Sequence, residues 1–106
     1  MAESEGVDLM VTADYLAKIR RGVRITQDDD FDEELKDIIE ECRQDLIQLG
    51  VIEEKANNES DPVILGLIRC FARWKFPIDE KAAELNRGDY MILRDEIRRR
   101  LEYVVD

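Results

Sequence analysis

Some of the residue types that commonly do chemistry are rare or absent in this chain, and their absence bears on which catalytic and metal sites it could form. The 106 residues contain no histidine and only two cysteines, Cys42 and Cys70, which are too far apart for a C-x-x-C motif. Typical zinc sites and histidine-based catalysis are therefore not expected. Both cysteines fall on apolar faces of predicted helices, so we expect two reduced core thiols of an intracellular protein rather than a disulfide.

The densest cluster of potential metal ligands is the run DDDFDEE at residues 28–34. An EF-hand loop beginning at Asp28 would need glycine at its sixth position and glutamate at its twelfth. The chain has Glu33 and Ile39 at those positions, so the calcium pattern fails. Acidic side chains stabilise the positive end of a helix dipole, and we interpret the run as the beginning of a helix.

The remaining charged groups also have simpler explanations than catalysis or nucleic-acid binding. The carboxylates lie on what reads as a solvated face, where nothing sets their pKa values apart as general acid–base chemistry requires. The basic run Arg98–Arg100 has acids at i,i+4 spacing, such as Asp95 with Arg99, which favours intrahelical ion pairs. The sequence therefore predicts no catalytic residue, no cofactor, no metal and no enzymatic activity.

The formal charge of −10 is concentrated in one segment. Residues 28–60 hold thirteen acids against three bases, whereas the segments before and after them are each neutral. A negative field disfavours nonspecific binding to DNA phosphates. The acidic segment therefore has two interpretations: a surface that keeps the protein soluble, or a surface that binds a basic partner.

The elements that must position these residues are all predicted to be helical. The N-terminus lacks the pattern of a signal peptide, and no apolar run is long enough to span a membrane. We expect a flexible arm over 1–11 and a single helical domain over 12–106. Caps and hydrophobic periodicity predict four to five helices, at about 13–21, 31–49, 62–76, 79–86 and 89–104, with a polar loop over 51–60. The fold class is an all-α bundle in which two long helices pack antiparallel around a buried third.

Four local signals fix the helix ends in this interpretation. Thr12 and Asp61 are suited to N-caps, the second followed by Pro62 at the first helical position. Asp30 with Glu33 resembles a capping box. Gly50 is expected to end the second helix in the left-handed conformation. Two apolar stripes are expected to face the core: Phe31, Leu35, Ile38, Ile39, Cys42, Leu46 and Leu49 in the second helix, and Tyr90, Leu93, Ile97, Leu101 and Val104 in the last.

The segment DPVILGLIRCFARWKF, residues 61–76, is apolar around most of its circumference. A surface helix needs an apolar face of only about 100°, so this helix must be covered on nearly every side, by its own chain or by a partner. Arg69 and Arg73 form its polar stripe, and they suit either ion pairs with the acidic helix or contacts with another subunit. Together with these arginines, the candidate interface residues are Leu65, Trp74 and Phe76.

The order of these motifs resembles the small head–tail connector proteins of tailed bacteriophages and prophages, some of them known as DNA-packaging proteins. VTADYLAKIR, DDDFDEELKDIIEECRQDLIQLGV and DPVILGLIRCFARWKF follow one another as in that family, and the likeness covers about residues 8–104. The matching positions are Asp32, Leu35, Ile38, Ile39 and Cys42, then Asp61, Pro62, Ile64, Ile68 and Phe76. Cys42 stands where the family usually has alanine, and the loop 51–60 and the residues after Pro77 show no detailed match.

The resemblance implies a structural subunit that forms a homo-oligomeric ring under the portal with the portal's symmetry. This ring extends the DNA channel and docks a stopper or tail-completion protein. It implies assembly in the bacterial cytoplasm, incorporation at the head–tail junction of the virion, no membrane, and DNA only as nonspecific cargo. On this view Asp32, Glu33, Glu40 and Glu41 form an acidic channel wall or docking face. The alternative is a small soluble helical regulator or antitoxin-like module with a basic protein partner.

Overall fold

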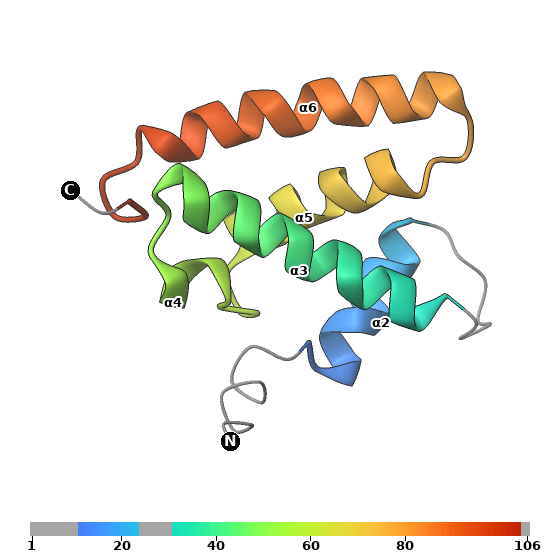
Figure 1. The fold of residues 1–106 in the computed structure, drawn as a ribbon, viewed down its shortest axis with the longest axis horizontal. Helices are drawn as coiled ribbons and strands as arrows, with labels where there is room; N and C mark the ends of the chain where they lie inside the picture. The colour runs from blue at the N-terminus through green and yellow to red at the C-terminus, as the bar shows by residue number, and fades with distance from the viewer. Residues whose placement is uncertain (1–10, 24–30, 105–106) are drawn as a thin grey trace.

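The computed structural model describes residues 11–23 and 31–104, and within these ranges the fold is all-α, as predicted (Figure 1). An isolated antiparallel bridge between Val51 and Val104 is the only β-type pairing among them. The helices are α2 (Ala13–Gly22), α3 (Asp32–Leu49), α4 (Glu53–Ala56), α5 (Pro62–Lys75) and α6 (Glu80–Arg98).

The apolar helix α5 lies at the centre and contacts α2, α3 and α6. The prediction that the two long helices pack antiparallel is wrong. The longest helices, α3 and α6, run in the same direction, and α5 runs antiparallel to each of them (Figure 1). Successive helices joined by reversing connections alternate in direction, so the first and third of such a series run the same way.

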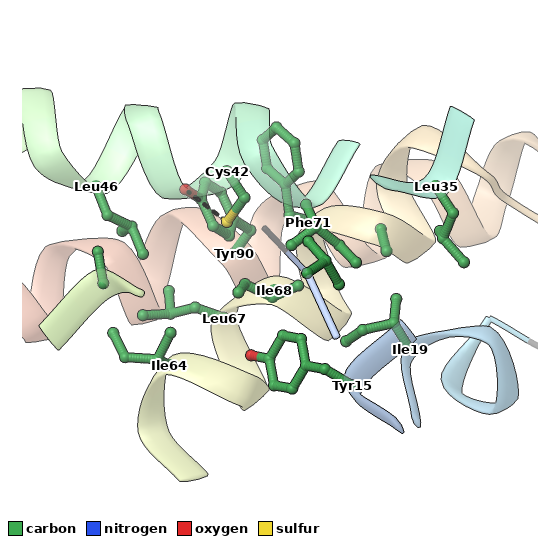
Figure 2. Close-up of a cluster of buried hydrophobic side chains, with 14 of the residues drawn as sticks. Tyr15, Ile19, Leu35, Cys42, Leu46, Ile64, Leu67, Ile68, Phe71 and Tyr90 are labelled. Atoms are coloured by element: carbon green, nitrogen blue, oxygen red, sulfur yellow. Dashed lines mark hydrogen bonds between the residues drawn. The ribbon is translucent and has the colours of Figure 1, made fainter. Parts of the chain in front are cut away.

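The core forms where α2, α3 and α6 close around α5 (Figure 2). The predicted stripe of α3 is confirmed at its centre, where Leu35, Ile39, Cys42 and Leu46 are fully buried. They meet the α5 side chains Ile64, Leu67, Ile68 and Phe71, together with Tyr15, Leu16 and Ile19 of α2 and Tyr90 and Ile97 of α6. Phe31, at the start of the stripe, is instead exposed.

Three of the four predicted end signals are confirmed. Thr12 Oγ1 accepts a hydrogen bond from Tyr15 N at 3.2 Å, and Asp61 Oδ1 accepts from Val63 N at 2.8 Å. Gly50 has φ 119°, a left-handed conformation that favours glycine. The fourth signal, the capping box at Asp30, lies outside the described residues, as do positions 1–10 of the predicted arm and the acids 28–30. Helix α3 begins at Asp32, and Phe31 at its N-cap makes no side-chain capping bond.

The segment predicted as a polar loop contains a short helix, α4. Its Ala56 is fully buried, and Ile52 N donates to Tyr103 O at 2.8 Å. Within α4, Ala56 is the only buried side chain, and the other three residues are charged. A helix of four residues with one buried position shows no hydrophobic period, so the sequence pattern does not predict it.

The two helices predicted over 79–86 and 89–104 form one continuous helix, α6, which ends earlier than expected. Asn86 does not cap an end, because its Nδ2 donates to Ala82 O within the helix at 2.8 Å. Glycine inside a helix costs only about 1 kcal/mol relative to alanine, and Tyr90 and Ile97 beyond Gly88 are anchored in the core. Because α6 ends at Arg98, Leu101 leaves the predicted stripe and is exposed.

The residues after α6 fold back against the start of α5. Tyr103 OH donates to the Asp61 carboxylate, with distances of 2.8 and 3.0 Å to its two oxygens. Asp61 therefore caps α5 and anchors the C-terminal segment at once.

Candidate assembly surfaces

The outer face of α3 carries a row of exposed acids. Glu33, Asp37 and Glu40 point away from the buried stripe, and within the described residues none of them has an ion-pair partner. Glu41 lies beside this row, with its carboxylate 3.8 Å from Lys75 Nζ. Of the four acids predicted for this face, Glu33 and Glu40 are therefore available to a partner, and Glu41 is exposed but paired with Lys75.

The fourth predicted acid, Asp32, is engaged within the chain. Arg20 of α2 donates to both of its carboxylate oxygens at 2.8 Å, and Arg20 Nε adds a contact of 3.2 Å. A bidentate arginine–carboxylate pair fixes orientation as well as distance. Asp32 therefore holds the beginning of α3 against the end of α2.

The arginine stripe of α5 lies over the end of α2 rather than over the acidic helix. Arg73 Nε donates to Gly22 O at 2.7 Å, and the Arg69 side chain lies 3.4–3.6 Å from the place that a Gly22 Cβ would occupy. Among the residues with described positions, neither arginine makes an ion pair. Cations near a helix C-terminus are stabilised by the negative end of the helix dipole. Both arginines therefore have an intrachain role, at the C-terminal end of α2.

The other candidate interface residues are half-buried against their own chain. Trp74 packs edge-to-face on Phe71, with ring centroids 5.4 Å apart, and Phe76 packs in the same way on Phe31 at 5.5 Å. Leu65 borders the core. The apolar excess of α5 is thus covered largely by its own neighbours, and Trp74 and Phe76 are among the side chains that remain partly open to another molecule.

A cleft of about 470 Å³ separates α3 from α6 above the C-terminal half of α5. Its floor is aromatic, formed by Phe71, Trp74 and Tyr90, and its rims are polar, with Glu41 and Gln44 on one side and Arg94 on the other. Lys75 Nζ lies 4.2 Å from the centroid of a Trp74 ring, a cation–π contact. The acidic row of α3 continues directly into one rim of this cleft through Glu41.

A chain of hydrogen bonds joins α3 to α6 at the bottom of the cleft. Tyr90 OH donates to Asp45 Oδ2 at 2.7 Å, Arg94 Nε donates to the same oxygen at 2.8 Å, and Cys42 Sγ lies 3.7 Å from Tyr90 OH. Burial raises the pKa of Cys42 to about 12 and the pKa of Tyr90 far above 10.0. Burial also favours a raised pKa for Asp45, but the bonds from Arg94 and Tyr90 outweigh it and lower that pKa. Tyr90 and Cys42 are therefore neutral and Asp45 ionised at neutral pH.

A second, smaller groove of about 250 Å³ lies on the other side of α6, against the N-terminal half of α5. Its lining is mainly apolar and includes Val63, Gly66, Leu67 and Leu93. Tyr90 and Arg94 face the cleft whereas Leu93 and Ile97 line or border this groove, so the two hollows lie on different sides of the α5–α6 contact.

Sequence reasoning missed the buried ion pair of Arg43, which lies on the apolar stripe of α3. Its side chain is 4% exposed and its Nη2 lies 3.4 Å from Glu59 Oε2, while Glu59 also accepts bonds from Thr12 N and Oγ1 at 3.0 and 2.6 Å. The Arg43 guanidinium lies 5.6 Å from the Tyr15 ring centroid. The one signal in the sequence is that Arg43 places a charge at an apolar position of the helical pattern. This charge links α3 to the beginning of α2 and to the loop before α5.

Sequence reasoning also missed an exposed apolar stripe on α6. Leu85 and Ile92 are 66% and 60% exposed on the outer side of the helix. The helix was predicted in two pieces, which hid the spacing of these residues.

The arrangement is that of a small all-α protein whose distinctive surface features are two hollows beside α5 and a row of exposed acids on α3. In the part of the chain with described positions, no group of three metal-binding side chains occurs, and no helix is long and apolar enough to cross a bilayer.

Comparison with known families identifies the family itself. The family model described as "Phage connector protein" matches residues 15–101, from α2 to beyond the end of α6. The chain belongs to this family of phage connector proteins, and the sequence resemblance is confirmed at that level. Comparisons with the curated proteins and with the solved structures gave no match.

Proposed function

We propose that this protein is a head–tail connector subunit that forms a ring beneath the portal, extends the DNA channel and docks the next stopper or tail-completion protein. The observation that carries the proposal is the family match over residues 15–101, which covers α3 to α6 and all but the first two residues of α2. The subunit assembles in the bacterial cytoplasm and remains in the virion at the head–tail junction. Its role is structural, with DNA as cargo and no catalysis.

A closed ring needs a heterologous contact, in which one surface of a subunit meets a different surface of its neighbour. The α3–α6 cleft and the α5–α6 groove are two such surfaces, and they lie on different sides of the α5–α6 contact. The cleft offers Trp74 from the predicted interface set, and the groove offers an apolar lining beside Leu93. Ring contacts through these two hollows would leave Glu33, Asp37 and Glu40 of α3 outside the interface, whereas Glu41 lines the cleft.

In this ring, Glu33 and Glu40 face the channel, and Glu41 lies where the channel wall meets the cleft contact. A negative wall repels DNA phosphates and limits sticking while the genome passes. Asp32 takes no part, because Arg20 already neutralises it. If these acids instead receive a basic docking partner, neutralising them weakens that one complex and leaves DNA passage unchanged.

Light scattering at several protein concentrations, with and without the purified portal ring, tests the ring. We expect a large complex of defined mass only with the portal present. Gly66→Arg fills the groove and Met91→Glu charges the rim of the cleft, so each should abolish that complex while circular dichroism stays unchanged. Lys18→Glu, on the exposed face of α2, is the matched control and should assemble normally.

A small complex that ignores the portal and forms only with a basic host protein would overturn the proposal in favour of a regulator. For the acidic row, the double variant Glu33→Gln, Glu40→Gln should form rings of normal mass but reduce the yield of DNA-filled heads. Unchanged packaging and unchanged assembly together would contradict the channel assignment.

A further inference from the structure

The outer face of α6 carries an apolar stripe that its own chain does not cover. Leu85 and Ile92 are 66% and 60% exposed, and seven residues of helix place them within about 20° of the same direction and about 10 Å apart along the axis. In Figure 1, α6 forms one edge of the molecule, and no other coloured element lies on its outer side.

Gly88 lies between these two residues on the same face, and nothing in its own chain explains a glycine there. The backbone is helical, and a Cβ added at Gly88 would meet no atom within 4 Å. Alanine would therefore fit and would favour the helix. A glycine at an exposed helix position does, however, permit another helix to approach closely.

The charges at the two ends of the stripe are complementary to each other. Lys81 lies four residues before Leu85, and Glu96 lies four residues after Ile92. Both are exposed, and no ion pair of either is found in the described ranges. Reversing the helix about the midpoint between Gly88 and Asp89 exchanges Leu85 with Ile92 and Lys81 with Glu96. The stripe is therefore complementary to an antiparallel copy of itself.

We propose that two copies of this protein pair through α6 as an antiparallel, two-fold symmetric dimer. Leu85 of each copy contacts Ile92 of the other, Lys81 faces Glu96 of the other, and Gly88 lets the two helices approach at the centre. The antiparallel arrangement also sets the positive end of each helix dipole beside the negative end of its partner. This contact is isologous, whereas the ring contact is heterologous, and it does not rest on the proposed function. The two contacts share Glu96, which also lines the α5–α6 groove.

Sedimentation equilibrium without the portal tests this pairing by exchange of charges. Lys81→Glu places glutamate against glutamate, and Glu96→Lys places lysine against lysine, so each variant alone should be monomeric at concentrations where the wild type is dimeric. An equimolar mixture of the two variants should form heterodimers, because both pairs are then of opposite sign. The double variant should dimerise like the wild type, and Glu53→Lys on α4 is the control for a change of net charge.

A second variant separates association from folding. Gly88→Ala should raise the melting temperature of the monomer but shift the mass toward monomer, because its methyl group holds the two helices apart. Gly66→Ala, a glycine in α5 with equally open surroundings, should leave the mass unchanged. A wild type that stays monomeric throughout, single charge variants that still dimerise, or a variant mixture that does not associate would each overturn the pairing. Normal ring formation by Lys81→Glu on the portal would show that the ring uses other surfaces.

Discussion

Helices α5 and α6 are antiparallel neighbours that differ in how far their apolar side chains are covered. Helix α5 is the most apolar helix, and α2, α3 and α6 cover most of it. Helix α6 is more polar, yet it leaves Leu85 and Ile92 open to solvent. The apolar content of a helix therefore does not tell which surface is left for a partner. The position of the helix in the bundle decides it, because a central helix has neighbours on several sides and an edge helix has them on one.

The largest expected effect contrasts one isoleucine from each helix. Ile68→Ala removes a fully buried side chain of α5 and should lower the free energy of unfolding by about 2–5 kcal/mol. Ile92→Ala on α6 should change it by less than about 0.5 kcal/mol in dilute monomer. Urea unfolding followed by circular dichroism measures both values. Equal losses at the two positions would mean that the outer face of α6 is covered within the monomer.

Loss of the N-cap of α5 should also destabilise the fold more than loss of the N-cap of α6. The Asp61 carboxylate accepts bonds from Val63 N, Ile64 N and Tyr103 OH, whereas among the described contacts the Asp79 carboxylate accepts only the bond from Ala82 N. Asp61→Ala should cost about 2 kcal/mol of unfolding free energy, and Asp79→Ala about 1 kcal/mol. Thermal melts of the two variants test this order. Tyr103→Phe should account for much of the difference, and a Tyr103→Phe variant as stable as the wild type would contradict the anchoring role.

Tyr90 joins α6 to α3, and the loss of its hydroxyl should have a smaller effect. Tyr90→Phe keeps the buried ring and removes the bond to Asp45, which still has Arg94 as a partner. We expect a loss of about 1 kcal/mol at pH 7, measured by urea unfolding. The near-ultraviolet circular dichroism of Trp74, in the same cleft, is a second measurement. It should show whether the aromatic floor of the cleft keeps its packing in the variant.

The same joint should make the fold sensitive to alkaline pH. The folded pKa values of Tyr90 and Cys42 are raised by burial, so their contribution to stability is complete below the unfolded values of 10.0 and 9.0 and is lost as the pH rises above them. The melting temperature should therefore fall from about pH 9 upward. Tyr90→Phe should flatten this fall above pH 10, while Tyr15, whose pKa is raised to about 12 by burial, maintains part of it. An identical alkaline profile in Tyr90→Phe would show that Tyr90 does not contribute.

The smallest expected effect is an increase in stability. Gly66 lies within α5, and a Cβ there would meet no atom within 4 Å. Gly66→Ala should raise the free energy of unfolding by about 0.5–1 kcal/mol, because it restricts the unfolded chain and favours the helix. Urea unfolding measures it. A destabilised Gly66→Ala variant would mean that the groove beside α5 is tighter than the structure indicates.

The candidate surfaces were predictable only where local pattern fixes them. The spacing of Leu35, Ile39, Cys42 and Leu46 set the buried side of α3, and the acids opposite them, Glu33 and Glu40, follow from the same helical period. The partners of Arg69 and Arg73 were not predictable in this way. Both arginines suited carboxylates of the acidic helix, but α2 brings the backbone of Gly22 to them instead.

By itself, the sequence determined that the chain is helical, where Thr12 and Asp61 begin helices, where Gly50 ends one, and which family the order of motifs resembles. These features depend on residues three or four positions apart, so the chain needs no distant contact to specify them. Only the tertiary structure decided that α3 and α6 run in the same direction, that α6 continues through Gly88, and that Tyr90 bonds to Asp45, 45 residues away. Such features depend on how whole helices pack, because many distant pairs are compatible with the same local pattern and packing selects one of them.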